Sequence, residues 1–360
     1  MADSPFATRR RSLRALVRAA GADALLVTNL LNIRYLTGFT GSNAALLLDA
    51  EGDERTLFCT DGRYVTQSQE EVPDLELVND RASAAALAKR AKGRTGFESQ
   101  HVSVEQYETL HALAEDAELA RTPGLVERLR LIKDEHEIGA LRKACAAADA
   151  ALAQLIERGG IRPGRTEREV ARELENLMLD HGSAARSFES IVAAGPNSAI
   201  PHHRPTGAVL ATGDFLKLDF GATVEGYHSD MTRTLVLGKA AGWQRELYDL
   251  VSQAQTEGSA AVRPGAVTKD VDKAARGVIE RAGHGDEFSH GLGHGVGLEI
   301  HEAPSLAKKG DGTLAAGMTV TVEPGVYLAG RGGVRIEDTL VVRDTVPELL
   351  TLSGKDLVVV

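Results

Sequence analysis

Five side chains of the types that bind divalent metal ions lie in the second half of the chain, each in a short segment rich in glycine or β-branched residues: Asp219, Asp230, His294, Glu323 and Glu337. Four carboxylates and one imidazole, without a thiolate, form a hard, oxygen-rich ligand set. Such a set suits Mn, Zn, Co or Fe(II) in a hydrolase better than structural zinc. Four carboxylates also balance the charge of two divalent cations. Two such cations about 3.5–4 Å apart can activate water and hold a scissile carbonyl.

An internal repetition supports treating the five residues as one site. GDFLKLDFG at 213–221 and GMTVTVEPG at 317–325 place an acid at the same step, and a second acid follows each run. Arg-Pro-Gly occurs at 162–164 and again at 263–265, in each case before a helical segment. A lone Asp in a strand-like run usually caps a turn, so the assignment depends on the whole set. The repetition predicts a duplicated α+β half-domain in which each half supplies two carboxylates to a common centre.

Three histidines lie in the segment HGLGHGVGLEIHE at 290–302. The spacing of His290 and His294 would place both on one face of a helix, but the intervening glycines argue against a helix. They indicate an extended backbone that another segment approaches closely. The H-E-x-x-H zinc motif is absent, because Ala-Pro follows His301 and Glu302. We predict that His294 is a ligand and that His290 and His301 lie beside the substrate. For His290, a hydrogen bond to the backbone is an equal alternative.

Two further features lie near these segments. His202 and His203 stand in a loop stiffened by a proline on each side, which can either reach the cleft or lie in solvent, and His203 is given no role. Arg335 precedes Glu337 by two residues, so a strand would place both side chains on one face. A cation beside a metal-binding carboxylate is costly unless it binds something, such as a substrate carboxylate or carbonyl.

With these residues, the sequence resembles the pita-bread metallopeptidases, specifically the Xaa-Pro peptidases prolidase (Xaa-Pro dipeptidase) and aminopeptidase P. NIRYLTGFTGSN at 32–43 resembles the N-terminal domain of that family, and LIKDEHEI at 131–138 resembles its interdomain helix. The resemblance implies an α/β N-terminal domain of the creatinase/prolidase type at 1–128. An α+β pita-bread catalytic domain built from duplicated halves would follow at 129–360.

The resemblance also implies roles for the site residues. The four acids and the imidazole named above would bind two divalent metal ions per chain, Mn first, with Zn or Co as alternatives. Glu323 would also take the proton of the attacking water, His301 and Arg335 would steady the intermediate or the proline side, and His202 would line the proline pocket. His202, His290, His301 and Arg335 would therefore contact the substrate.

The implied activity is hydrolysis of the bond between an N-terminal residue and proline. We expect an Xaa-Pro dipeptidase, because the compact length resembles that of small bacterial prolidases, with aminopeptidase P acting on longer peptides as the alternative. Creatinase and non-catalytic peptide-binding relatives lack the metal ligands, so the intact set argues against both. The family suggests a homodimer.

Composition limits the remaining classes. The chain has 360 residues, 43% of them hydrophobic, and a net charge of −10, which argues against a nucleic-acid partner. Its two cysteines, Cys59 and Cys145, provide no disulfide framework and fit a reducing cytoplasm. The arginine-rich segment 9–18 has helical periodicity, so we expect an amphipathic helix and no targeting segment. No apolar run is long enough to span a membrane.

The element pattern places the site residues on rigid supports. Short apolar strands are expected at 24–28, 44–48 and 56–59, and a single linker helix at 125–157. Strands at 215–220 and 319–322 would end at the first acid of each repeat. Helices are expected at 243–261 and 268–282, and a capping box at Thr166 and Glu169 opens another.

Overall fold

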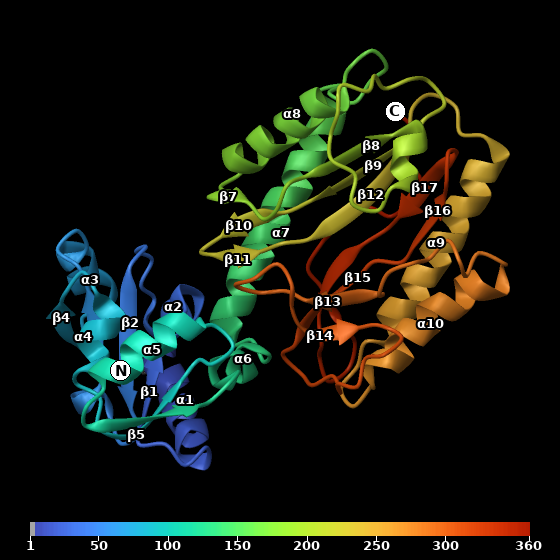
Figure 1. Ribbon diagram of the computed structural model, residues 1–360. Helices are drawn as coiled ribbons and strands as arrows, with labels where there is room; N and C mark the ends of the chain where they lie inside the picture. The colour runs from blue at the N-terminus through green and yellow to red at the C-terminus, as the bar shows by residue number, and fades with distance from the viewer. Residues whose placement is uncertain (1–3) are drawn as a thin grey trace. The chain divides into compact units, whose positions relative to one another are not determined.

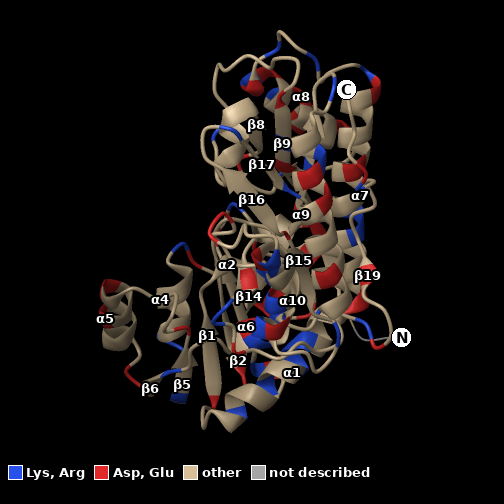
Figure 2. Ribbon diagram, turned by 90° about the vertical axis from the view of Figure 1, so that its right-hand side faces the viewer, with Lys and Arg blue, Asp and Glu red and all other residues tan. Residues whose placement is uncertain are grey.

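The structure is a computed structural model that describes residues 4–360. The chain divides into two compact units, Met1–Arg130 and Leu131–Val360, whose elements are labelled in Figure 1. Acidic and basic positions are interspersed along the helices, as Figure 2 shows. Among residues 4–360, no helix combines the length and apolar character that crossing a membrane requires.

The first unit is an α/β unit built on a six-stranded sheet with the order β4-β3-β2-β1-β5-β6. Strands β1, β5 and β6 are parallel neighbours, β3 and β4 are also parallel, and β2 is antiparallel to both β1 and β3. The strands are β1 Ala24–Val27, β2 Ala44–Asp49, β3 Leu57–Thr60, β4 Glu76–Asn79, β5 Gly93–Phe97 and β6 Ala117–Arg121. The helices are α1 Pro5–Ala19, α2 Leu30–Thr37, α3 Val65–Glu71, α4 Ser83–Ala88, α5 Val104–Leu113 and α6 Leu125–Arg130.

Helix α1 confirms the amphipathic helix predicted from the arginine-rich segment. Arg10 is fully buried and its guanidinium donates to both Asp53 and Asp74, while Leu13 and Val17 face the core. The buried arginines of this helix, Arg9, Arg10 and Arg14, therefore serve the packing of the unit. Both cysteines are free and buried, as expected of small apolar residues.

The second unit contains two similar groups of elements. In the first, α7 Glu135–Glu157 and α8 Glu167–Asp180 pack beside the sheet β12-β9-β8, formed by Met231–Val236, Phe215–Phe220 and Ile191–Ala194 (Figure 1). In the second, α9 Gly242–Ala261 and α10 Thr268–Arg281 accompany the sheet β14-β13-β15-β18-β19, formed by Glu302–Leu306, Gly293–Gly295, Thr319–Val322, Asp338–Val341 and Glu348–Leu349. The remaining strands are β7 Ala185–Arg186, β10 Ala222–Val224, β11 Tyr227–His228, β16 Gly325–Leu328 and β17 Gly332–Arg335.

Each group has an apolar core of its own. Val170, Leu174 and Leu218 belong to the first core, and Ile279 and Val320 belong to the second. The two groups meet where Thr232 of β12 bridges Glu337, the residue before β18. This arrangement agrees with the duplicated half-domain predicted from the repeated sequence.

The single helix predicted over 125–157 is wrong, because the structure divides it into α6 and α7. Lys133 N donates to Gly317 O at 2.9 Å, which takes the backbone out of the helix. Asp134 then starts α7 by a capping box, since its side chain accepts from Glu137 N at 2.9 Å while Glu137 accepts from Asp134 N at 3.0 Å. The capping box at Thr166 and the helices α9 and α10 confirm the predictions for those segments.

Candidate metal centre and active-site cavity

The strand register brings the predicted ligands of the two halves together. Thr232 pairs with Asp219 on one side and bridges Glu337 on the other, so β12 connects the two sheets at the site. Asp230 comes directly before β12, and Glu323 directly after β15. Each half therefore supplies two carboxylates from the ends of neighbouring strands. His294 of β13 adds the imidazole.

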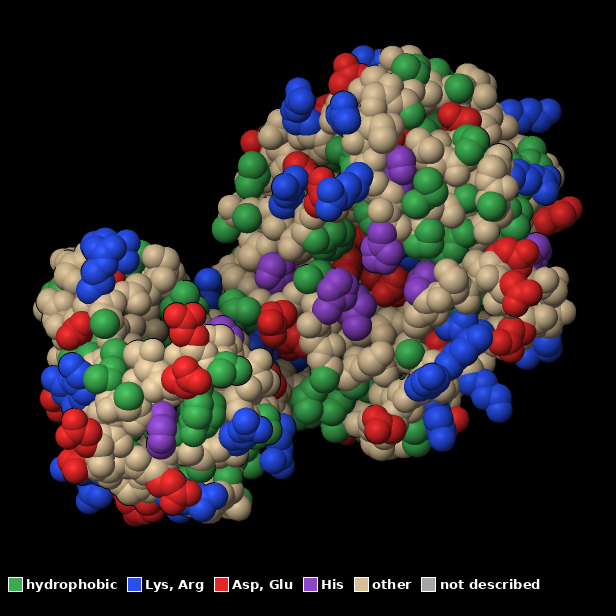
Figure 3. Space-filling model, in the orientation of Figure 1, with side chains coloured by type: hydrophobic (Ala, Val, Ile, Leu, Met, Phe, Trp, Pro, Cys, Tyr) green, Lys and Arg blue, Asp and Glu red, His purple; other side chains and the backbone are tan. Residues whose placement is uncertain are grey.

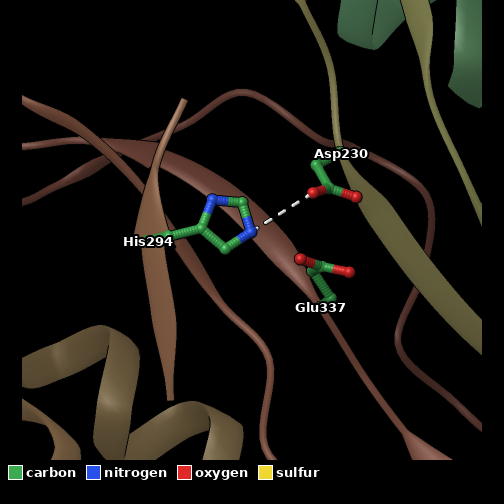
Figure 4. Close-up of side chains that lie close together, drawn as sticks. All are labelled: Asp230, His294 and Glu337. Atoms are coloured by element: carbon green, nitrogen blue, oxygen red, sulfur yellow. Dashed lines mark ion pairs between the residues drawn. The ribbon is translucent and has the colours of Figure 1, made fainter. Parts of the chain in front are cut away.

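The five side chains line one cavity of about 540 Å³. Figure 3 shows histidine and acidic side chains gathered in this hollow of the second unit. Ligand atoms of Asp230, His294 and Glu337 all lie within 4.8 Å of one another. Figure 4 shows these three side chains turned toward one another. Nε2 of His294 lies 3.5 Å from Oδ2 of Asp230 and 3.5 Å from Oε1 of Glu323. Asp219 lies in the same wall, where Arg335 donates to its Oδ2.

Two features of the side chains fit a bound cation. Nδ1 of His294 lies 3.0 Å from the carbonyl oxygen of Gly295, and because a carbonyl can only accept, Nδ1 carries the proton. The lone pair of Nε2 is therefore directed at the acids, which is the tautomer of a metal ligand. In addition, Oδ1 of Asp219 is buried and has no hydrogen-bond donor among the described residues. A buried carboxylate oxygen without a partner is costly, and a metal ion would satisfy it.

The electrostatics of the cluster agree with this fit. Burial, followed by repulsion from neighbouring carboxylates, raises the pKa of Asp230 and of Glu337 well above the ordinary range. Burial also raises the pKa of Glu323 to about 8, with a further contribution from Asp219. Burial lowers the pKa of His294 to about 4, so its imidazole is neutral at pH 7, as a ligand must be. Divalent cations would offset the repulsion among these acids.

Arg335 holds several of these groups in place. Its Nε donates to Thr232 Oγ1 at 3.0 Å, and Thr232 Oγ1 in turn donates to Glu337 Oε2 at 2.7 Å. Its Nη1 donates to the hydroxyl of Tyr327 at 2.7 Å, and its Nη2 to Asp219. Arg335, which was predicted to contact the substrate, thus lines the cavity, and its guanidinium donates hydrogen bonds to protein groups.

The other predicted histidines also line the cavity. Nδ1 of His290 donates to Gly291 O at 2.8 Å, so Nε2 accepts from the hydroxyl of Tyr327 at 2.8 Å. His290 therefore makes the backbone hydrogen bond that was the alternative to a place beside the substrate, and it also lines the cavity. The ring of His301 lies edge-on to that of His294, with centroids 4.4 Å apart.

The loop with His202 is held from behind by a buried acid. Glu167 accepts from His203 Nε2 at 2.8 Å, from Thr206 N at 2.8 Å and from Thr206 Oγ1 at 2.6 Å. Its other oxygen accepts from Ala194 N and Asn197 Nδ2, both at 2.9 Å. His203, for which no role was predicted, thus anchors the loop through Glu167, and both His202 and His203 line the cavity.

Close packing explains the glycines around His294. A Cβ at Gly293 would lie 2.0 Å from Thr321 O, and one at Gly295 would lie 2.1 Å from Ala303 O. Strands β14 and β15 approach β13 on both sides, so only glycine fits at these two positions. The close approach predicted from the glycine pattern is confirmed.

Sequence reasoning missed several residues of the site. These are Glu167, Lys217, Thr232 and Tyr327, which hold the loop and the guanidinium in place. Lys217 is fully buried in β9, where its Nζ donates to Ile200 O at 2.7 Å. A lysine between two leucines of a predicted buried strand was the one available signal.

Comparisons with known proteins agree with this geometry. Residues 139–344 match metallopeptidase family M24, and residues 9–132 match the creatinase/prolidase N-terminal domain. An Xaa-Pro dipeptidase of Pyrococcus furiosus is 34% identical over 335 residues, which cover 93% of this chain and 95% of that protein.

Solved structures give the same result over the whole chain. An Xaa-Pro dipeptidase from Bacillus anthracis matches with a TM-score of 0.93 at 40% identity, covering 99% of this chain and 100% of that one. An X-Pro aminopeptidase from Thermotoga maritima matches with a TM-score of 0.88 at 32% identity, covering 98% and 99%. The predicted fold class and resemblance are thereby confirmed. The chain therefore belongs to metallopeptidase family M24, with a creatinase/prolidase N-terminal domain preceding the peptidase domain that contains the cavity.

Proposed function

We propose that the protein is a prolidase, which hydrolyses the Xaa-Pro bond of dipeptides with two divalent metal ions per chain. The ions would be held by Asp219, Asp230, His294, Glu323 and Glu337. The observation that supports this most is the convergence of four carboxylates and a neutral imidazole from two half-domains on one cavity of about 540 Å³. A cavity of this size is typical of small-molecule sites.

The bound metal ions would supply an activated water and a Lewis acid for the scissile carbonyl. Glu323 would accept the proton that the water loses, the role that the family resemblance implies for it. Its carboxylate lies 3.5 Å from Nε2 of His294 and 4.0 Å from Nε of Arg335. The fixed charge of Arg335 and the imidazole of His301 would stabilise negative charge that develops on the substrate. His202 would line the proline pocket. Burial lowers its pKa, so it would do so as a neutral ring.

The dipeptide preference is supported by the relatives. The matching proteins from Pyrococcus furiosus and Bacillus anthracis are Xaa-Pro dipeptidases. The matching structure from Thermotoga maritima is an X-Pro aminopeptidase, so cleavage of longer peptides is the alternative. A non-catalytic peptide-binding protein would not need the five predicted metal ligands. A preparation that never takes up two equivalents of metal would favour this role.

Turnover of an Xaa-Pro dipeptide and of the matching Xaa-Pro-Ala tripeptide, measured side by side on Mn-loaded protein, tests this proposal. Faster hydrolysis of the dipeptide supports a prolidase. Faster release from the tripeptide favours aminopeptidase P, and hydrolysis of neither peptide removes the Xaa-Pro activity.

We also propose the identity of the metal, the oligomeric state, the domain limits and the location. We propose Mn as the metal, because the oxygen-rich set suits it. We propose a homodimer, and domain limits of 1–128 and 129–360. We also propose a reducing, cytoplasmic location, which agrees with two free, buried cysteines.

A further inference from the structure

The cavity is lined by two side chains with a permanent positive charge, Arg204 and Arg335. The two guanidinium groups differ in burial and in the number of hydrogen bonds that they donate to protein groups. The guanidinium of Arg335 is buried and donates to Asp219, Thr232 and Tyr327. The side chain of Arg204 is 84% exposed, and its recorded partner is Glu189, with 3.4 Å from Nε to Oε2. Glu189 also lines the cavity, and its side chain is 53% exposed.

The backbone that carries Arg204 is fixed, although its guanidinium is not. His203 and Thr206, on either side, are both held by the buried carboxylate of Glu167. Pro205 O accepts from Arg168 Nε at 3.2 Å. Arg204 is therefore a long cationic side chain on an anchored loop at the cavity rim, two residues after His202.

A dipeptide places a specific demand on this cavity. Its proline carries a free carboxylate, which must enter a cavity whose walls already contain five acids, namely Asp219, Asp230, Glu323, Glu337 and Glu189. Two divalent metal ions would balance the four acids of the centre, and the guanidinium of Arg335 already donates to Asp219, Thr232 and Tyr327. Arginine is the side chain best suited to the substrate carboxylate, because its planar fork donates two parallel hydrogen bonds to a carboxylate. Of the two arginines, Arg204 is the one whose donors are available.

We propose that Arg204 binds the free C-terminal carboxylate of Xaa-Pro dipeptides, and that Glu189 is an intramolecular competitor for the same guanidinium. An exposed ion pair of this kind is weak, so the substrate carboxylate displaces Glu189 at little cost. The interaction favours dipeptides over substrates in which the proline carboxylate is blocked. This inference rests on the proposed Xaa-Pro activity and adds the residue that recognises the end of the substrate.

The test compares an Xaa-Pro dipeptide with the same dipeptide as its C-terminal amide. We expect Arg204→Gln to lower kcat/KM for the free dipeptide by about ten-fold or more, mostly through KM, and to leave the amide within about two-fold of wild type. Glu189→Gln should raise kcat/KM for the free dipeptide and leave the amide unchanged. Both side chains are largely exposed, so the Tm of each variant should equal that of wild type.

Equal effects of Arg204→Gln on both substrates, or no effect on either, would overturn the assignment of Arg204. If wild-type protein cleaves the Xaa-Pro substrates and Arg204→Gln does not selectively impair the free dipeptide, this inference alone is contradicted. Metal-loaded wild-type protein that cleaves none of these substrates would contradict the proposed Xaa-Pro activity and this inference with it.

Discussion

The guanidinium of Arg335 in β17 donates a hydrogen bond to Oδ2 of Asp219 in β9, so a cation from one half-domain holds a predicted metal ligand of the other. The second oxygen of the same carboxylate, Oδ1, is buried and has no donor among residues 4–360. One oxygen is thus fixed by the protein and the other is left for a cation. This division orients the carboxylate of Asp219 before any metal binds.

Metal binding should stabilise the protein more at pH 8 than at pH 5. In the metal-free fold the pKa of Glu323 is raised to about 8 from an ordinary 4.5, chiefly by burial. Between these values the unfolded chain loses a proton that the folded chain keeps, so the stability of the metal-free protein falls as the pH rises. Divalent ions bind the charged carboxylates and offset this loss.

The measurement is the Tm at both pH values, with Mn and with a chelator. Glu323→Gln, which cannot titrate, should lessen the pH dependence of the metal-free protein, while Asp230 and Glu337, whose pKa values are also raised, keep the remainder. An unchanged Tm after chelation at pH 8 would count against a shared metal site.

Glu337→Ala should abolish turnover and lower the bound metal, while circular dichroism remains that of the wild type. Glu337 is fully buried and supplies one atom of the cluster with Asp230 and His294. Its removal takes a charge and a ligand from the centre. Activity and elemental analysis should be compared with Glu257→Gln, an exposed acid on α9, which we expect to match wild type. Near-normal turnover of Glu337→Ala would remove this residue from the ligand set.

Gly293→Ala should displace His294 and lower both activity and Tm. The added Cβ would lie 2.0 Å from the backbone oxygen of Thr321, which cannot move without shifting β15. We expect a loss of about ten-fold or more in kcat/KM, because a displacement of about 1 Å at a reacting group costs that much. Gly139→Ala in α7 is the matched control, since no atom lies within 4 Å of its Cβ.

The control variant should keep full activity and gain roughly 0.5–1 kcal/mol of stability, because alanine favours a helix over glycine. A Gly293→Ala protein with wild-type kinetics would show that β13 tolerates the shift.

Glu167→Gln should loosen the loop that carries His202. The carboxylate accepts hydrogen bonds from His203, Thr206, Ala194 and Asn197. In the variant, the NH2 group of the amide would replace one accepting oxygen and would face groups that can only donate. We expect a loss of about 1–3 kcal/mol in the free energy of unfolding. The variant should also have a lower kcat/KM and keep its full metal content. Glu175→Gln in the same helix alters only an exposed pair with Arg186 and should match wild type. A Glu167→Gln protein with wild-type kcat/KM would show that His202 does not depend on this anchor.

The candidate metal ligands were easier to predict from the sequence than the residues that hold them in place. The five predicted ligands could be proposed because an acid recurs at the same step of two similar strands and because glycines crowd one histidine. Thr232 and Tyr327 could not be found in this way, since Thr and Tyr are ordinary strand residues and their roles arise from partners far along the chain. The same limit explains the helix break at 131–134, which depends on a bond from Lys133 to Gly317.

The central claim is that five side chains from two half-domains hold two divalent ions. Anomalous scattering from crystals of the Mn-loaded protein tests it most directly. We expect two peaks about 3.5–4 Å apart, each within bonding distance of carboxylates among Asp219, Asp230, Glu323 and Glu337, with His294 bound to one of them. No peak in this cavity, or peaks bound by other residues, would contradict it.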